Sequence, residues 1–306
     1  MEGKRTIQYL SNKEIDKVKW DQCIDDAPNG LIYAYSFYLD HMAKHWDALV
    51  LNDYEAVFPL TWNSKYGVSY LYQSFLSAQL GLFGKSIDAS LLEQFFQSIP
   101  SKFKYWDFYL NHHNVIMVPG FDLYERSNYV LKLDKSYEEL QSGYRDNIKR
   151  NVRKSAQVGC YLEKEIDAEK VITLALEQMR QHTNESTDNV DRFRRLFGFL
   201  KEKKMASTYG IFLNDELLAS CIFFFSHNRA YYILVGNHPN GKTIGASHAL
   251  IDAFVKDHAG TNLVLDFEGS DIRNLAFFYS SFGAVEEKYA AIKMNRLPFY
   301  LKWLKR

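Results

Sequence analysis

The pattern of hydrophobic and polar positions predicts two strands joined by a helix in the last third of the chain. Branched and aromatic residues fill 230–235 and 263–267, as is typical of buried strands. Between them, apolar residues recur at helical spacing over 246–258, and Gly260 follows as a helix C-cap. Two strands joined by a helical crossover are expected to lie parallel and adjacent in one sheet. A further helix is predicted over 272–282.

The same order of elements is predicted in both halves of the chain. Each half contains a strand, helices, an antiparallel meander, a helix and a strand, although no repeat is visible residue by residue. We therefore predict an α/β fold with two tandem domains, 1–130 and 131–306. Each is expected to have a twisted, mostly antiparallel mixed sheet with a central parallel strand pair and flanking helices.

Helix signals outside the last third are also clear. Ser136 and Glu139 form a capping-box signature, and Gly159 is expected to end the helix that follows. Helices are predicted over 12–23, 36–45, 87–99, 136–159, 168–182 and 191–205.

Composition narrows the possible functions. The 306 residues suffice for two domains, and the formal net charge of zero does not indicate binding to nucleic acid or membranes. The three cysteines are far apart and the N-terminus lacks an apolar signal region, so we expect a cytoplasmic protein without a metal site. The longest apolar run, 217–225, is too short to span a bilayer. After Leu140, basic residues outnumber acidic ones, which suits an anionic ligand.

A glycine-containing turn, 236–245, joins the first predicted strand to its helix. Such a turn presents free backbone N–H groups and the positive end of the helix dipole, which suit a phosphate or pyrophosphate. The order of glycine, lysine and hydroxyl residues differs from a Walker loop. An ordinary solvated loop is the alternative. The donor-binding candidates are Val235, Gly236, Asn237, Gly241, Lys242, Thr243, Gly245 and Ser247.

Part of this turn resembles the acyl-CoA pyrophosphate loop of the GCN5-related N-acetyltransferases (GNAT). Their pattern is Gln/Arg-x-x-Gly-x-Gly/Ala. Lys242 stands in the basic position, Gly245 matches, and Ser247 replaces the last small residue.

The helix that follows resembles two branches of this superfamily. Tyr279 and Gly283 have the spacing of the Tyr-x-x-x-Gly-Phe ending of GNAT helices. Phe278, Phe282 and Gly283 are similar to the Phe-Lys-x-x-Phe-Gly ending of the FemAB branch, with Tyr279 in place of the lysine. The basic run 144–154 also resembles the segment that opens the second FemAB domain. The chain is therefore similar to a FemAB-like, tandem GNAT acyltransferase.

The resemblance implies direct acyl transfer to an amine without a covalent intermediate. A backbone N–H near 235–237 would polarise the donor carbonyl, and the anion loop would orient the donor. Asp266 and Glu268 share one face of a strand end, so either carboxylate could accept the proton of the amine. Tyr279 would protonate the leaving group. The alternatives are a core aromatic for Tyr279 and a cap or ion-pair role for the carboxylates.

Three residues are candidates for contact with the substrate: Arg145, Lys149 and Tyr232. Arg145 and Lys149 belong to a basic cluster with Arg150, Arg153 and Lys154. This cluster suits the phosphates of a nucleotide-linked substrate or a tRNA acceptor stem, and a solvated helix face is the alternative.

The expected function is that of an N-acyltransferase, with acyl-CoA or aminoacyl-tRNA as cosubstrate and no bound cofactor. The acceptor would be a small-molecule or peptide amine, and the first domain, with a degenerate donor site, would shape its groove. Two alternatives stay open. One is a FemAB-type, tRNA-dependent aminoacyl transferase in peptidoglycan precursor synthesis, against which the chain has no space for the long helical arm of several members. The other is a non-catalytic ligand-binding protein with the same fold.

Overall fold

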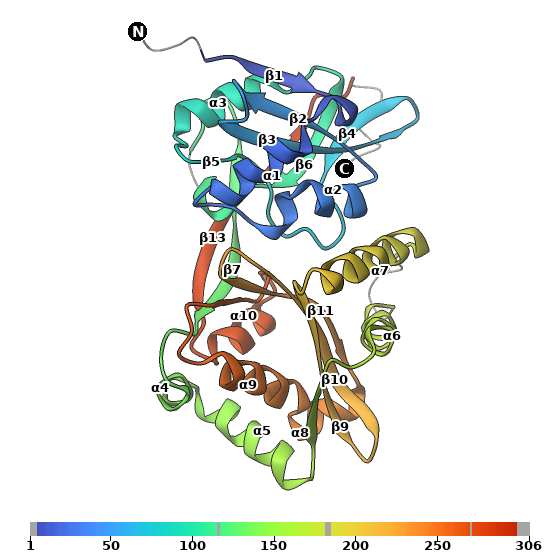
Figure 1. Ribbon diagram of the computed structural model, residues 1–306, viewed down its shortest axis with the longest axis vertical. Coiled ribbons are helices and arrows are strands. Elements are labelled where there is room, and N and C mark those ends of the chain that lie inside the picture. Colours follow the sequence, from blue (N-terminus) through green and yellow to red (C-terminus); the bar gives the residue numbers. More distant parts are fainter. Residues whose placement is uncertain (1–4, 115–116, 181–184, 270, 299–306) are drawn as a thin grey trace. The chain divides into compact units, whose positions relative to one another are not determined.

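The chain forms two compact units (Figure 1). The computed structural model describes residues 5–114, 117–180, 185–269 and 271–298. The described residues up to Arg126 form the first unit together with those from Lys288 onward, and Ser127–Glu287 form the second. We expected a boundary near residue 130 and a second domain that continues to the end of the chain. The C-terminal strand instead returns to the first unit, because its residues 291–295 pair antiparallel with residues 105–109.

The first unit is a mixed sheet with helices packed on it. Its strands are β1 (Ile7–Leu10), β2 (His45–Leu51), β3 (Ala56–Lys65), β4 (Val68–Tyr72), β5 (Phe83–Gly84) and β6 (Phe103–Tyr109), and its helices are α1 (Lys17–Asp26), α2 (Ser36–Met42) and α3 (Ala89–Ser98). The strand order is β1-β2-β3-β4-β6-β13, where β13 (Val285–Asn295) is the C-terminal strand, and β5 pairs with β3. Neighbours are antiparallel apart from the parallel pair of β4 and β6.

Aromatic side chains fill the core of this unit. Asp88 caps α3 by accepting a hydrogen bond from the Leu91 amide (2.7 Å). The helix then buries Phe95 and Phe96 against Phe58 of β3, with ring centroids 6.2 and 6.1 Å apart.

The second unit repeats this plan with more helices. Its strands are β7 (Leu123–Lys132), β8 (Tyr161–Lys164), β9 (Ala206–Leu213), β10 (Glu216–Ser226), β11 (Arg229–Asn237), β12 (Val264–Asp266) and β13 (Val285–Asn295), of which β7 and β13 contribute residues to both units. Its helices are α4 (Tyr137–Ser142), α5 (Asp146–Gln157), α6 (Ala168–Met179), α7 (Thr187–Glu202), α8 (Pro239–Ile244), α9 (Ala246–His258) and α10 (Arg273–Ser280). The strand order is β7-β12-β11-β10-β9-β8.

Helices cover both faces of the second sheet. In Figure 1, α6 and α7 lie on one side, and α9 and α10 lie on the other with α4 and α5 outside α9. The core on the α9 side is aromatic, and the rings of Phe223 and Phe254 stack with centroids 3.9 Å apart. This packing fixes α9 against β9 and β10.

The predicted tandem arrangement of two mixed-sheet domains is confirmed. Each unit runs through a strand, two helices, an antiparallel three-strand meander, a helix and a strand parallel to the last meander strand. In the first unit these last three elements are β4, α3 and β6, and in the second they are β11, α9 and β12.

Three local predictions need correction. The helix expected over 136–159 is two helices, because α4 ends at its C-cap Gly143 and α5 begins after Arg145, although the capping box at Ser136 is present. The turn 236–245 contains the short helix α8, since Pro239 occupies its first turn and Gly245 ends it with a φ of 78°. The helix expected from residue 12 begins as a 3₁₀ turn, Asn12–Glu14, and α1 starts only after the cap Asp16.

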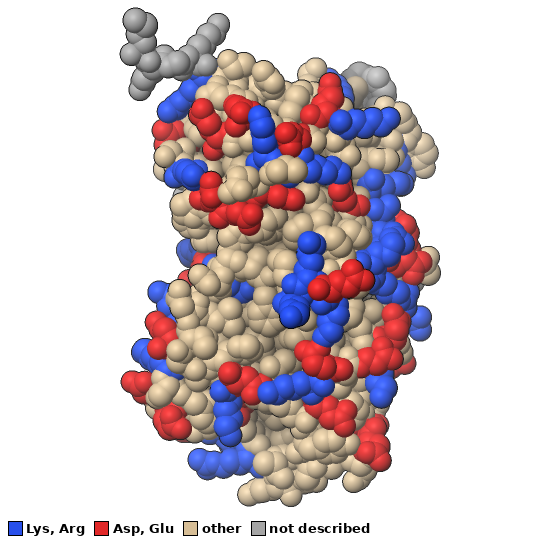
Figure 2. Space-filling view, viewed as in Figure 1, with Lys and Arg blue, Asp and Glu red and all other residues tan. Residues whose placement is uncertain are grey.

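Surface charge agrees with the composition. On the face drawn in Figure 2, basic and acidic side chains are interspersed over both units. Across the described ranges, every helix is too short or too polar to cross a membrane.

Candidate functional site

The parallel strands β11 and β12 separate after three paired positions. Residues 229–231 of β11 pair with residues 264–266 of β12, where β12 ends. β11 continues to Asn237 along β10 alone. The last six residues of β11 therefore have an edge that β12 does not cover, and backbone groups on this edge are available to a ligand.

A β-bulge in β11 helps to separate the strands. Ile222 of β10 lies opposite Leu234 and Phe223 lies opposite Tyr232, so Ile233 is an extra residue in β11. A bulge bends its strand and increases the local twist. A bulge two residues after the last pair with β12 is expected to turn the end of β11 away from β12.

The hydrogen bonds at the end of β11 indicate which amide faces the open edge. The His238 amide donates to the Leu218 carbonyl of β10 (2.9 Å), whereas the Asn237 amide donates to Oε1 of Gln178 on α6 (2.8 Å). Since amide directions alternate along a strand, Gly236 faces β10 and Val235 faces the edge left by β12. Asn237 faces the same edge, but its amide is held by Gln178, so of the three predicted backbone donors Val235 is the one left for a ligand.

Gly236 is required by the close approach of α6. A methyl group at this position would lie 2.8 Å from the backbone nitrogen of Ala175 and 2.9 Å from the Leu174 side chain. We expect Gly236→Ala to lower the free energy of unfolding by about 1–3 kcal/mol in urea denaturation, because α6 would have to shift.

Gly198 in α7 provides the matched control for this substitution. A methyl group there meets no atom within 4 Å, so Gly198→Ala should raise the free energy of unfolding by about 0.5–1 kcal/mol. Equal effects of the two substitutions would contradict the close packing of α6 on β11.

The turn between α8 and α9 has features that suit an anion. Gly245 offers no side chain to cap α9, so no side-chain acceptor occupies the first-turn amides. Helix α5 packs on this turn, since a methyl group on Gly245 would lie 2.6 Å from the Asn151 carbonyl oxygen. Lys154 donates to the Thr243 carbonyl (2.7 Å). Lys242 is exposed and has no ion pair with another described residue.

The structure brings the donor-binding candidates to one place. The Ser247 hydroxyl donates to Oδ1 of Asn237, which ties the start of α9 to the end of β11. Gly241 is buried beside the Leu218 carbonyl, so α8 lies directly on the first residues of β10. Lys242 and Thr243 follow it on the exposed side of α8.

Tyr279 lies beside this opening as a neutral hydroxyl donor. Its ring stacks on Phe267 with centroids 4.5 Å apart, and Phe267 also contacts Tyr232 at 6.0 Å. The Tyr279 hydroxyl makes no hydrogen bond to another described residue. Burial, together with the nearby Glu268 carboxylate, raises the pKa of Tyr279, so the phenol stays protonated at neutral pH. Burial likewise raises the pKa of Tyr232 well above its usual value.

The profile of the acetyltransferase (GNAT) domain family matches residues 142–271, which include most of this site. Residues 142–271 are a GNAT domain. The match covers α5, the meander, α8, α9 and β12, and it stops before α10 with Tyr279. A comparison with curated protein sequences finds no match.

Solved structures with the same fold span nearly the whole chain. FemX is 13% identical and has a TM-score of 0.65, with 97% of this chain and 99% of FemX covered. The C-terminal domain of a putative lysylphosphatidylglycerol synthetase from Agrobacterium fabrum is 13% identical, with a TM-score of 0.57 and 93% of each chain covered. A tandem GNAT protein from the clavulanic acid biosynthesis pathway is 9% identical, with a TM-score of 0.52 and coverages of 96% and 99%. The FemAB-like, tandem GNAT fold expected from the sequence is confirmed.

The two carboxylate candidates of the GNAT domain differ in their surroundings. Asp266 is 2% exposed; its Oδ2 accepts from Arg229 (2.6 Å) and its Oδ1 from the Glu268 amide (2.7 Å). Arg229 also bonds Glu287 (2.9 Å). Burial alone would lower the pKa of Arg229, but the two carboxylates outweigh it and raise that pKa. Asp266 thus fits the ion-pair alternative, whereas Glu268 is half-buried and close enough to influence Tyr279.

Two substrate-binding candidates at the start of α5 contact neighbouring residues of the same unit. The Arg145 guanidinium lies over the Phe277 ring of α10 (4.7 Å), and Lys149 donates to the Ser142 carbonyl (3.1 Å). Arg150 and Arg153 are exposed without an ion pair to another described residue. Of the five basic residues predicted as a cluster, Lys154 is the one that bonds the segment before α9, through the Thr243 carbonyl of α8.

Three residues of the GNAT domain that shape the site were not predicted from the sequence. Gln178 holds the Asn237 amide, Asn151 contacts Gly245, and Ile233 forms the bulge. The sequence signals Gln178 only as a polar residue near the end of an apolar helix. Nothing in the spacing of the sequence marks Asn151 or Ile233. Within the described ranges, no group of three or more His, Cys, Asp or Glu side chains is placed to hold a metal ion.

Proposed function

We propose that the protein is an N-acyltransferase that transfers an acyl group from an acyl-CoA thioester directly to a primary amine. The observation that carries this proposal is the separation of β11 from β12 at a bulge, directly before the uncapped N-terminus of α9. A thioester in this opening would have its phosphates near the start of α9 and its carbonyl at the free edge of β11.

Each group in the opening has a role in this reaction. The Val235 amide donates to the carbonyl oxygen, which gains negative charge as the amine nitrogen attacks the carbonyl carbon. Glu268 accepts the amine proton, directly or through a water, and the carbon–sulfur bond breaks. Tyr279 gives its proton to the departing thiolate. Glu268 then returns a proton to Tyr279, so the products are an amide and a free thiol and the site is regenerated.

An aminoacyl-tRNA is the second candidate donor. The observation that favours it is the pair of exposed arginines on α5, Arg150 and Arg153, which have no ion-pair partner among the described residues. Against it, Lys154 and Asn151 of the same helix are already engaged with the turn before α9.

Titration with both donors tests the proposed function. Coenzyme A and acetyl-CoA should raise the melting temperature in a saturable way, and charged tRNA should not. Stabilisation by charged tRNA alone would replace the proposed donor by the second candidate, and stabilisation by none of the three would favour a non-catalytic binding protein.

Lys242 should contribute to donor affinity. Because the side chain is exposed beside the turn, Lys242→Ala should weaken coenzyme A binding about 3–10-fold, and less so at high salt. Lys170→Ala, at an exposed position on α6, is the matched control and should leave the affinity unchanged. Calorimetry measures both constants, and an equal loss in the two variants would place the phosphates elsewhere.

A further inference from the structure

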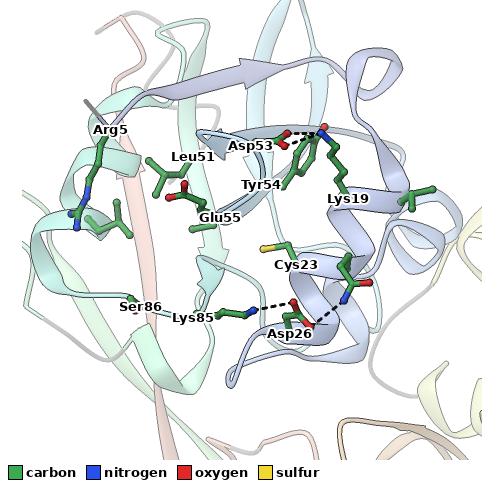
Figure 3. Close-up of a pocket in the computed structure, with 14 residues that line it drawn as sticks. Arg5, Lys19, Cys23, Asp26, Leu51, Asp53, Tyr54, Glu55, Lys85 and Ser86 are labelled. Atoms are coloured by element: carbon green, nitrogen blue, oxygen red, sulfur yellow. Dashed lines mark hydrogen bonds and ion pairs between the residues drawn. The ribbon is translucent and has the colours of Figure 1, made fainter. Parts of the chain in front are cut away.

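A cavity of about 600 Å³ lies in the first unit. Helix α1, the turn that joins β2 to β3, and the segment before α3 line it, and it is open to solvent on one side (Figure 3). Its volume lies in the range of small-molecule pockets. All the residues that line it belong to the first unit, so it is distinct from the acyl-transfer site proposed above.

The floor of this cavity is apolar. Leu51, Ala56 and Leu91 form this floor, and each of these residues is at most 5% exposed. Cys23 joins them from α1, and its sulfur points into the space between the helix and the strands in Figure 3. Burial raises the pKa of the Cys23 thiol to about 11, so it remains a neutral, weakly polar part of the floor at physiological pH. The floor therefore suits an aliphatic group.

The rim carries balanced charge. Lys19 pairs with Asp53 (2.7 Å) and Lys85 pairs with Asp26 (3.0 Å). These two pairs leave one cation and one anion of the rim without an ion-pair partner among the described residues, Arg5 and Glu55. Because the three cations and three carboxylates of the rim balance, neither a polyphosphate nor a polyamine would gain a net electrostatic attraction. A ligand with one positive and one negative group complements this rim.

The turn at the rim is held in a strained conformation. Tyr54 has a φ of 63°, in the left-handed region that a tyrosine seldom adopts. Its hydroxyl accepts a hydrogen bond from the Asp16 amide at the start of α1 (2.7 Å), which fastens the turn to this helix. Asn52 in the same turn donates to Glu55 (2.9 Å), so the carboxylate is oriented before a ligand arrives. Strain of this kind is concentrated at ligand sites.

We propose that this cavity binds a small zwitterion, an amino acid or dipeptide with an apolar side chain. Its ammonium group would lie against Glu55, its carboxylate against Arg5, and its side chain on the floor beside Cys23. This site does not depend on the proposed acyltransferase activity, because none of its residues belongs to the donor site.

Four ligands of graded charge test the site by calorimetry on the full chain. Leucine and leucyl-leucine carry both charges, N-acetyl-leucine lacks the ammonium group, and leucine amide lacks the carboxylate. The better of the two zwitterions should bind about tenfold more tightly than either singly charged analogue, and which of the two it is identifies the occupant. No saturable binding up to about 10 mM, or equal binding of all four ligands, would overturn the proposal.

Two variants test which residue binds each charged group of the ligand. In Glu55→Gln the preference for leucine over N-acetyl-leucine should disappear, while the preference over leucine amide remains. Arg5→Gln should show the opposite pattern. Glu93→Gln on α3 removes a carboxylate outside the cavity lining and should preserve both preferences. If the two cavity variants keep both preferences as well, the zwitterion binds elsewhere.

Alkylation of Cys23 gives a second readout of the same site. In a Cys160→Ser background, which removes the partly exposed thiol, saturating zwitterion should slow the reaction of Cys23 with N-ethylmaleimide at least several-fold, as followed by peptide mass mapping. Binding without any protection of Cys23 would refute an occupant on this floor.

Discussion

Replacing Arg229 with methionine should lower the free energy of unfolding by about 3–5 kcal/mol. The guanidinium lies between Asp266, which is 2% exposed, and Glu287, at distances of 2.6 and 2.9 Å. Methionine fills a similar volume without the charge, so the substitution leaves two carboxylates close together and without their cation. Urea denaturation with the midpoint and slope fitted separately measures the loss.

Arg194 is the matched control for this ion-pair cluster. It too bonds two carboxylates, Glu169 and Asp191, at 2.9 and 2.7 Å, but 40% of its side chain is exposed. Since solvent screens exposed pairs, Arg194→Met should cost less than about 1 kcal/mol. A similar cost for the two arginines would mean that burial does not strengthen the contacts of Arg229.

Arg229 also connects stability with the geometry of the site. It starts β11, and its partner Asp266 ends β12 at the last position where the two strands pair. The ion pair therefore holds the strands together just before the bulge at Ile233 turns β11 away. Arg229→Met is consequently expected to weaken donor binding as well as the fold.

Local patterns in the sequence were sufficient to predict the strand–helix–strand unit. The buried strands are continuously apolar and the intervening helix has regular apolar spacing, so β11, α9 and β12 and the parallel pairing followed from periodicity. The periodicity of each half predicted the tandem order of elements in the same way. These features depend on neighbours in the chain, which a pattern can show.

Features that depend on distant contacts could not be predicted. The Arg229 ion pairs join residues 37 and 58 positions apart, and Gln178 reaches Asn237 over 59 positions. The bulge at Ile233 depends on the pairing register of β10 and β11, and the continuously apolar sequences of these strands do not determine that register. The return of the C-terminal strand to the first unit is likewise a pairing with residues 105–109 that no local signal marks.

Replacing Tyr279 with phenylalanine should reduce the turnover number about 100-fold while leaving the affinity for the acyl-CoA donor unchanged. Phenylalanine keeps the stacking on Phe267, which lies 4.5 Å away, so the fold around the opening is preserved and the loss is confined to the hydroxyl. A 100-fold loss corresponds to about 2.7 kcal/mol of transition-state stabilisation. Steady-state release of free thiol, with the donor found by titration and a primary amine, measures the turnover number and the KM separately.

Tyr161→Phe provides the control for this experiment, because Tyr161 is an exposed tyrosine of the same unit whose hydroxyl bonds only Asp215 (3.0 Å) among the described residues. Its removal should change turnover less than twofold. The raised pKa of Tyr279 adds a second test, since the protonated phenol should persist and turnover should not fall through tyrosine ionisation between about pH 7 and 9. If Tyr279→Phe retains turnover within twofold of the unsubstituted protein, the thiolate takes its proton from water. Tyr279 would then be a packing residue beside Phe267.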